Sequence, residues 1–276
     1  MNKLKKLKFI GKDTQLKIFL VLAIIVVLIA IFAPKIIPYS FDEEVGASLT
    51  APNGKYFFGT DQIGRDLFSR VIYGARYSIF MTMTLVFIIF VVGTVLGVIA
   101  GYFGGIADSV IMRIGDMMIA FPGLILAIAI AGLLGPSVRN AIIAISAVTW
   151  TKYARLARSM VLKIKQELYV EAAKITGSRN YSVIFKYIIP NMITTMIVTA
   201  VSDMGTLMLE IAALSFLGFG AQPPTPEWGA MLNEGRTTLS RAPWMMMYPG
   251  LAIVIVVIIF NMLGDSVRDL VDVKNE

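Results

Sequence analysis

The chain has 276 residues, of which 57% are hydrophobic and 16% are charged, and its formal net charge is +7. A soluble domain is closer to half apolar and a quarter charged, so this composition indicates a membrane protein. Cysteine and histidine are both absent, which excludes disulfides, thiol nucleophiles, and the commonest general base and metal ligand.

The amino-terminal region joins a basic segment to an apolar run. Residues 1–17 carry six lysines and one acid, and the apolar stretch 18–33 follows them. A secretory signal peptide has the same layout, but this run is long for one and no clear cleavage site follows it. We therefore expect a retained first span, followed by a polar segment over 38–78.

A second span is predicted over residues 79–100, which as a helix would measure about 33 Å. Gly93, Gly97 and Gly101 lie four residues apart there, and such spacing of small residues lets two helices approach closely. Packing within the chain is the expected use of this glycine stripe, with a homodimer face as the alternative.

The next two spans are less regular. A glycine-rich turn over 101–105 and the segment 112–122 lead to a third span, expected over 117–134. The apolar run 141–151 is too short to cross a bilayer alone, so the fourth helix is extended through the basic segment 152–162.

The segment 171–191 is the longest polar, charge-bearing run in the second half of the chain. Glu171, Ala172 and Ala173 are expected on a short helix, whose small side chains would let another backbone approach. Gly177 tolerates a positive φ, so the chain can turn there. This arrangement is typical of a docking element that projects from a membrane.

A second helical run, over 181–189, leads to Pro190, which suits the first turn of a following helix because it lacks an amide hydrogen. The fifth span is expected over 192–216 and the sixth over 244–263. With six spans, both termini share one side with the segment 152–190. Because that side carries 17 of the 25 Lys and Arg residues, it is predicted to be cytosolic.

Asp203 and Glu210 lie seven residues apart on the fifth span, and therefore on one helical face. An acid near mid-membrane costs roughly 2.5–3.5 kcal/mol on insertion scales, so water, a partner cation or protonation must offset it. We interpret both acids as lining a translocation route. The alternatives are a polar clamp to another membrane subunit or, for Glu210, a carboxylate that reaches the interface.

The triplet Glu171–Ala172–Ala173, with Gly177 four residues later and Pro190 thirteen after that, resembles the EAA loop of membrane subunits in binding-protein-dependent ABC importers. The match departs at Tyr187 and Ile189, where Ile and Leu are usual. Three further runs are similar to the second membrane subunit of the branch that serves dipeptides, oligopeptides and nickel: GTDQIGRD (59–66), MRIGDMMIAFP (112–122) and LSFLGFGAQPPTPEWGAML (214–232).

This resemblance covers nearly the whole chain and implies an all-α, polytopic fold with six transmembrane helices, the type I ABC importer permease fold. Residues 1–75 would hold the amino-terminal tail, first helix and external segment, 76–265 the transmembrane domain, and 266–276 a cytosolic tail. The implied partners are a second homologous permease subunit, two ATPase subunits or domains, an external solute-binding protein and membrane lipid, but not nucleic acid.

No G-x-x-x-x-G-K-[ST] run occurs, so ATP and Mg²⁺ are expected on the partner ATPase subunits, with no cofactor, metal or catalytic residue on this chain. Glu171 is expected to accept hydrogen bonds from the ATPase, the alternative being a solvated acid at a helix start. Asp61, Arg65 and Asp66 are candidate contacts for the external binding protein, or else a self-contained ion network.

The substrate stays open between peptides and nickel or metal chelates. Trp150 ahead of the segment 152–155, together with Asp203, leans slightly towards nickel. The sixteen methionines are interpreted as packing residues rather than soft-metal contacts.

Two rival functions are a proton-coupled transporter that uses Asp203 and Glu210, and an intramembrane protease. Gly264-Asp265 lacks the earlier glycine that the protease site needs.

Overall fold

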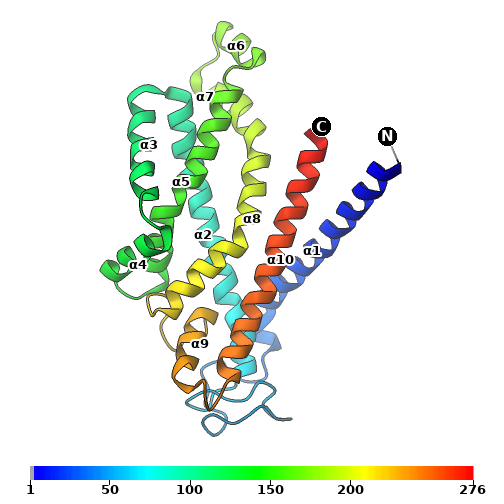
Figure 1. Cartoon of the computed structure of the whole chain (residues 1–276), viewed down its shortest axis with the longest axis vertical. Coiled ribbons are helices and arrows are strands. Elements are labelled where there is room, and N and C mark those ends of the chain that lie inside the picture. Colours follow the sequence, from blue (N-terminus) through cyan, green and yellow to red (C-terminus); the bar gives the residue numbers. More distant parts are fainter. Residues whose placement is uncertain (1–2, 276) are drawn as a thin grey trace.

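The computed structural model describes residues 3–275, with side chains described for residues 14–270. Apart from isolated β-bridges, the regular structure in that part of the chain is helical, as predicted. Long helices form a bundle (Figure 1): α1 (Lys3–Ile36), α2 (Leu67–Phe103), α5 (Val138–Ile164), α8 (Ile189–Phe216) and α10 (Trp244–Asn275). The shorter helices are α3 (Gly105–Ile119), α4 (Gly123–Leu134), α6 (Leu168–Ile175), α7 (Asn180–Val183) and α9 (Trp228–Gly235). A π-turn, η1 (Ile184–Ile188), and a 3₁₀ turn, η2 (Arg236–Thr238), complete the set.

Within the described residues, four helical stretches are long and apolar enough to cross a membrane: Thr14–Ile36, Leu67–Phe103, Asn180–Phe216 and Trp244–Leu270. α3 and α4 are each too short, but as one span bent by 94° they raise the count to five. The 27 residues of α5 would measure about 40 Å. Because its second half is basic, its role as the predicted fourth span, which would bring the total to six, stays a prediction.

The third predicted span is not a single helix. The helix α3 ends at Ile119, and the next helix, α4, begins at Gly123. Pro122 explains the break, because proline lacks an amide hydrogen and pushes the residue before it away from helical conformation. Residues 105–116, expected to be a connection, instead belong to α3. By contrast, the predicted continuation of the fourth helix through 152–162 is confirmed by α5.

α2 and α5 pack together along the glycine stripe. A Cβ atom on Gly93 would lie 2.4 Å from the Cβ of Tyr153, and one on Gly97 would lie 2.3 Å from the carbonyl oxygen of Ala154. Neither distance leaves room for a side chain. The predicted use of the stripe for packing within the chain is therefore confirmed.

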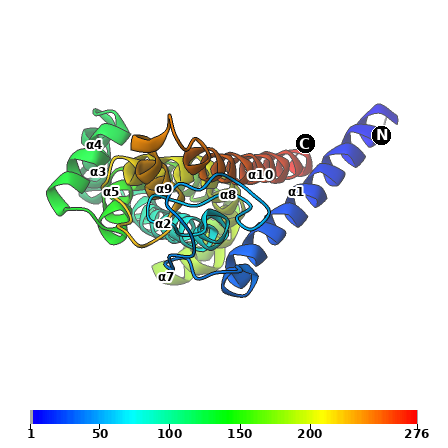
Figure 2. The same ribbon diagram turned by 90° about the horizontal axis from the view of Figure 1, so that it is seen from below.

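α1 is attached to the bundle along only part of its length. Its amino-terminal part diverges from α10 in both views (Figure 1, Figure 2). Ala23 and Ala30 are buried against α2 and α10, where their small side chains permit close contact. Among residues 14–36 of α1, most of the larger apolar side chains are exposed, so this part of the helix presents a surface suited to lipid or to another subunit.

The two ends of the bundle are built differently. α6, α7 and both ends of the described chain lie at one end, while α9 and the segment 38–66 lie at the other (Figure 1). We call them the α6 end and the α9 end. The segment 38–66 passes across the α9 end of the bundle (Figure 2), and Gln62 donates from its side-chain amide to the carbonyl of Glu234 (2.7 Å).

Candidate functional site

α6 projects from the bundle as a separate short helix (Figure 1). It ends in a turn in which the amide of Ser178 donates to the carbonyl of Ala173 (3.0 Å) and the amide of Gly177 donates to that of Lys174 (3.0 Å). This pair of bonds requires a positive φ directly after the helix. Gly177 has a φ of 83°, which confirms its predicted part in the turn.

The two sides of α6 differ in what they contact. Val170 is fully buried in the main hydrophobic core of the bundle, and Ala173 is also buried. Leu168, Ala172 and Ile175 follow one another at intervals of four and three residues and therefore share the opposite face. Leu168 is 82% exposed and Ile175 87% exposed, so this outer face is apolar and open to a partner.

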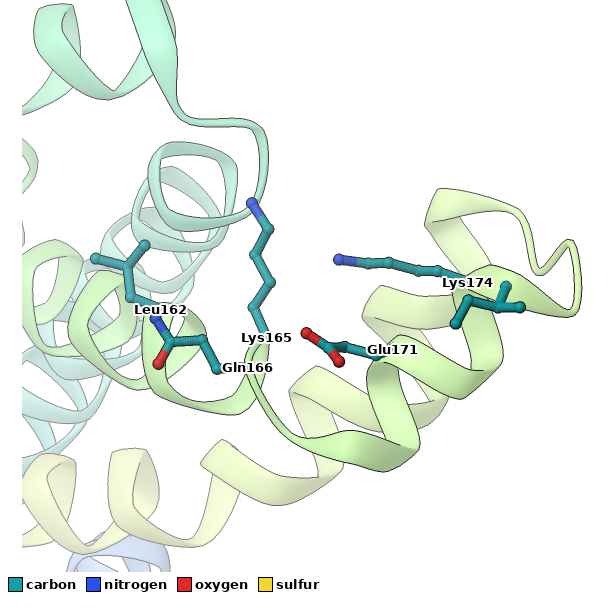
Figure 3. A pocket seen from close by; sticks show the side chains of 6 residues that line it. Leu162, Lys165, Gln166, Glu171 and Lys174 are labelled. Carbon is teal, nitrogen blue, oxygen red and sulfur yellow. The ribbon is translucent and has the colours of Figure 1, made fainter.

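A hollow of about 510 Å³ lies between the end of α5 and α6. The carboxylate of Glu171 points into the gap between Lys165 and Lys174 (Figure 3). Within the described residues, Glu171 takes part in none of the ion pairs, and its side chain is exposed. This acceptor is thus uncommitted beside the apolar outer face of α6.

The loop joins α8 through a wider helical turn. Pro190 lies in the first turn of α8, as predicted, and α8 continues directly from η1. A proline placed inside a helix clashes with the carbonyl four residues earlier. In η1 the amide of Ile189 donates to the carbonyl of Ile184, five residues back, and this wider spacing accommodates Pro190.

Asp203 has a cationic partner within the chain. Lys152 of α5 donates from Nζ to both carboxylate oxygens of Asp203, at 2.7 and 2.8 Å, and the hydroxyl of Tyr153 donates to Oδ2 at 3.1 Å. The Lys152 side chain is nevertheless 57% exposed, against 15% for Asp203. Glu210 is half-buried and lies seven residues further along α8, or about 10 Å.

Sequence analysis missed Lys152 and Tyr153 as partners of Asp203. The available signal was a lysine directly after the apolar run 141–151, where a charge requires compensation. Because α5 and α8 supply opposite charges, the pair holds these two helices together and leaves the ammonium group of Lys152 partly exposed.

A buried ion network ties the external segment to α9. Asp61 accepts from Nε of Arg65 at 2.6 Å and from the guanidinium of Arg70, while Glu234 accepts from Nη2 of Arg70 at 2.9 Å and from Nη2 of Arg65 at 3.3 Å. Arg70 is fully buried. Two cations and two anions balance here, as burial of charge requires.

The three residues predicted to meet the binding protein are buried. Asp61 and Asp66 are each 1% exposed and Arg65 is 7% exposed. Asp66 caps α2 by accepting from the amide of Ser69 at 2.8 Å. The geometry favours the alternative of a self-contained network, and contact with a binding protein stays a prediction. Arg70, which completes the network, was not singled out in the sequence.

α9 is anchored through its capping residue. Glu227 is fully buried and accepts from the amides of Gly229 and Ala230, both at 2.9 Å, and from the hydroxyl of Ser78 on α2 at 3.2 Å. Burial raises the pKa of Glu227, while these backbone donors act in the opposite direction. The α9 end of the bundle therefore rests on specific polar contacts as well as on apolar packing.

Comparison with known proteins places these features in a family. Residues 93–275 match the family described as binding-protein-dependent transport system inner membrane component. The chain is 47% identical over 249 residues to the dipeptide transport system permease protein DppC of Alkalihalophilus pseudofirmus, covering 90% of this chain and 82% of the relative. It is 41% identical over 253 residues to the glutathione transport system permease protein GsiD of Escherichia coli, covering 91% and 84%.

The fold also resembles that of a solved structure whose sequence identity to this chain is lower. The inward-facing MetNI methionine ABC transporter aligns with a TM-score of 0.58 at 18% identity, over 74% of this chain and 97% of that one. Together with the apolar helices, these matches identify a multi-pass protein of the bacterial inner membrane. The chain belongs to the inner membrane components of binding-protein-dependent transport systems, the non-catalytic permease subunits of ABC importers, whose ATPase lies on a partner chain and whose solute arrives on a binding protein.

Proposed function

We propose that this permease subunit imports di- or oligopeptides. The support comes from relatives at 41–47% identity that are named as dipeptide and glutathione permeases. Nickel or a metal chelate is the second candidate from the sequence. Its support weakens because the carboxylate of Asp203, part of the basis for that leaning, is engaged by Lys152 of the same chain.

The coupling of transport to ATP is proposed to pass through α6. The observation that carries this proposal is the apolar outer face of α6, with Leu168 and Ile175 almost fully exposed beside the uncommitted carboxylate of Glu171. An exposed apolar patch of this kind typically marks a protein contact. Ala172 and Ala173 would allow close approach, and ATP with Mg²⁺ would bind to the partner ATPase subunits.

The orientation that follows places the α6 end in the cytosol, with both termini, and the α9 end outside. The distribution of Lys and Arg along the sequence supports this orientation. A second permease subunit and lipid would cover the exposed apolar surfaces of α1 and α3, and the external binding protein would dock at the α9 end.

Cross-linking tests the proposed coupling. Because the chain contains no cysteine, Ala172→Cys reports on its own position alone. In the assembled complex we expect it to form an adduct with the ATPase. Thr225→Cys, placed between α8 and α9, is the matched control and should react with impermeant thiol reagent from outside only. An Ala172 cysteine that reacts from outside, or that never joins the ATPase, would contradict the proposal.

Asp203 and Lys152 are proposed to line the translocation route, together with Glu210. Asp203→Asn is expected to lower peptide uptake by about tenfold or more, because hydrogen bonds to charged groups are worth roughly 1.5–3 kcal/mol. Asp116→Asn is the matched control, since its ion pair with Arg155 is largely exposed and such pairs contribute about 0–1 kcal/mol. Equal uptake by the two variants, at equal protein level in the membrane, would remove Asp203 from the route.

A further inference from the structure

Tyr102 occupies the last turn of α2, directly beside the loop that carries α6. Its side chain is only 6% exposed. The phenolic hydroxyl donates to Oδ1 of Asn180 at 2.9 Å, and Asn180 is the first residue of α7. The end of α2 is thus bonded to the segment through which the loop returns to α8.

The backbone and ring of Tyr102 contact two further parts of the loop. The last carbonyls of a helix lack partners, and the last turn of α2 contains no basic residue of its own. Lys165, at the end of α5, supplies the missing hydrogen-bond donor: its Nζ atom donates to the carbonyl of Tyr102 at 2.8 Å. The Nζ atoms of Lys165 and of Lys174 on α6 lie 5.7 and 5.5 Å from the ring centroid, within cation–π range.

One residue of α2 therefore contacts the end of α5, α6 and the start of α7. Lys165 and Lys174 also flank the hollow into which Glu171 points (Figure 3), so a partner seated against α6 would press on the groups that surround Tyr102. α2 has 37 residues and would measure about 55 Å as a helix. It runs from Tyr102 to the buried Arg70 network at the α9 end, and along the way it packs closely on α5.

We propose that Tyr102 is a positioning residue for coupling, which transmits a displacement of α6 to α2 and through α2 to the rest of the bundle. This inference rests on the proposed function of α6 and adds the residue that connects it to the membrane helices. In this role Tyr102 need bind neither solute nor nucleotide itself. Its effect is on how much transport each round of ATP hydrolysis produces.

The test is the ratio of ATP hydrolysed to peptide imported, measured with the complete complex and its binding protein in liposomes. Tyr102→Phe removes only the hydroxyl, and loss of a hydrogen bond of ordinary strength predicts a rise of about two- to tenfold in this ratio. Tyr73→Phe makes the same change near the other end of α2 and should leave the ratio unchanged. Asn180→Ala removes the acceptor at an exposed position and should reproduce the effect of Tyr102→Phe.

The double variant separates coupling from general damage. If the hydroxyl acts through Asn180, then Tyr102→Phe combined with Asn180→Ala should raise the ratio no further than either change alone. An unchanged ratio in both single variants, with the Ala172→Cys adduct to the ATPase intact, overturns the role of Tyr102 alone. Absence of that adduct in the otherwise unaltered chain overturns the proposed function of α6 instead.

Discussion

Arg70→Leu is expected to destabilise the protein by roughly 3–5 kcal/mol, because it removes one partner from a buried set of ion pairs. Arg70 is fully buried, and its loss would leave Asp61, which is 1% exposed, with Arg65 as its remaining cation. Glu234 would lose its shorter ion pair. We expect a lower unfolding temperature in detergent and faster proteolysis within the segment 38–66, which the network connects to α9.

Arg76→Leu provides the control for this prediction. Arg76 lies six residues further along α2 and is exposed, so the same substitution there should change the free energy of unfolding by no more than about 0.5 kcal/mol. If Arg70→Leu proves as stable as Arg76→Leu, the network does not hold the external segment in place. Leucine would then replace the buried ion pairs without loss.

Gly97→Ala is expected to destabilise the contact between α2 and α5 by about 1–3 kcal/mol, the usual cost of overpacking. The added Cβ would lie 2.3 Å from the carbonyl oxygen of Ala154 and 2.6 Å from the Cβ of Ala157. Both atoms belong to, or are fixed by, the α5 backbone, so the helices must separate. The measurements are the unfolding temperature in detergent and the amount of folded protein in the membrane.

Gly115→Ala is the matched comparison in α3. A Cβ atom there would approach no atom closer than 3.8 Å, which is ordinary contact. Alanine is also a better helix former than glycine by about 1 kcal/mol, so this variant should be as stable as the original chain or slightly more so. Equal loss of stability in both variants would mean that helix flexibility, and not close packing, accounts for the glycine stripe.

Several features could be predicted because they depend on a few neighbouring residues. The apolar runs around 18–33, 79–100 and 244–263 all lie within long helices, since backbone groups in a bilayer must be bonded within the segment. Gly177 was predicted to permit a turn, and it has a positive φ. The limits of the helices were harder to predict. α2 begins at Leu67, twelve residues before the expected start, because Asp66 caps it locally.

In the candidate site, too, some features could be predicted from neighbouring residues and others depended on the tertiary structure. Glu171, Ala172 and Ala173 were singled out from their residue types, their spacing and their position between apolar spans. That α6 presents an apolar face beside an uncommitted carboxylate depends on how Val170 and Ala173 are buried. Asp203 was singled out as a charge in an apolar span. Its partner Lys152 is 51 residues away, and nothing in the local pattern of either residue specifies the other.

The sequence by itself determined the class of this protein: a helical membrane protein with a polar segment between apolar runs, because hydropathy and the placement of charges and glycines are local properties. Only the tertiary structure decided which charges meet. Arg70 is 164 residues from Glu234, and Tyr102 is 78 residues from Asn180. Such pairs form when packed helices bring distant segments together, and a carboxylate or a hydroxyl has many possible partners until that packing is known.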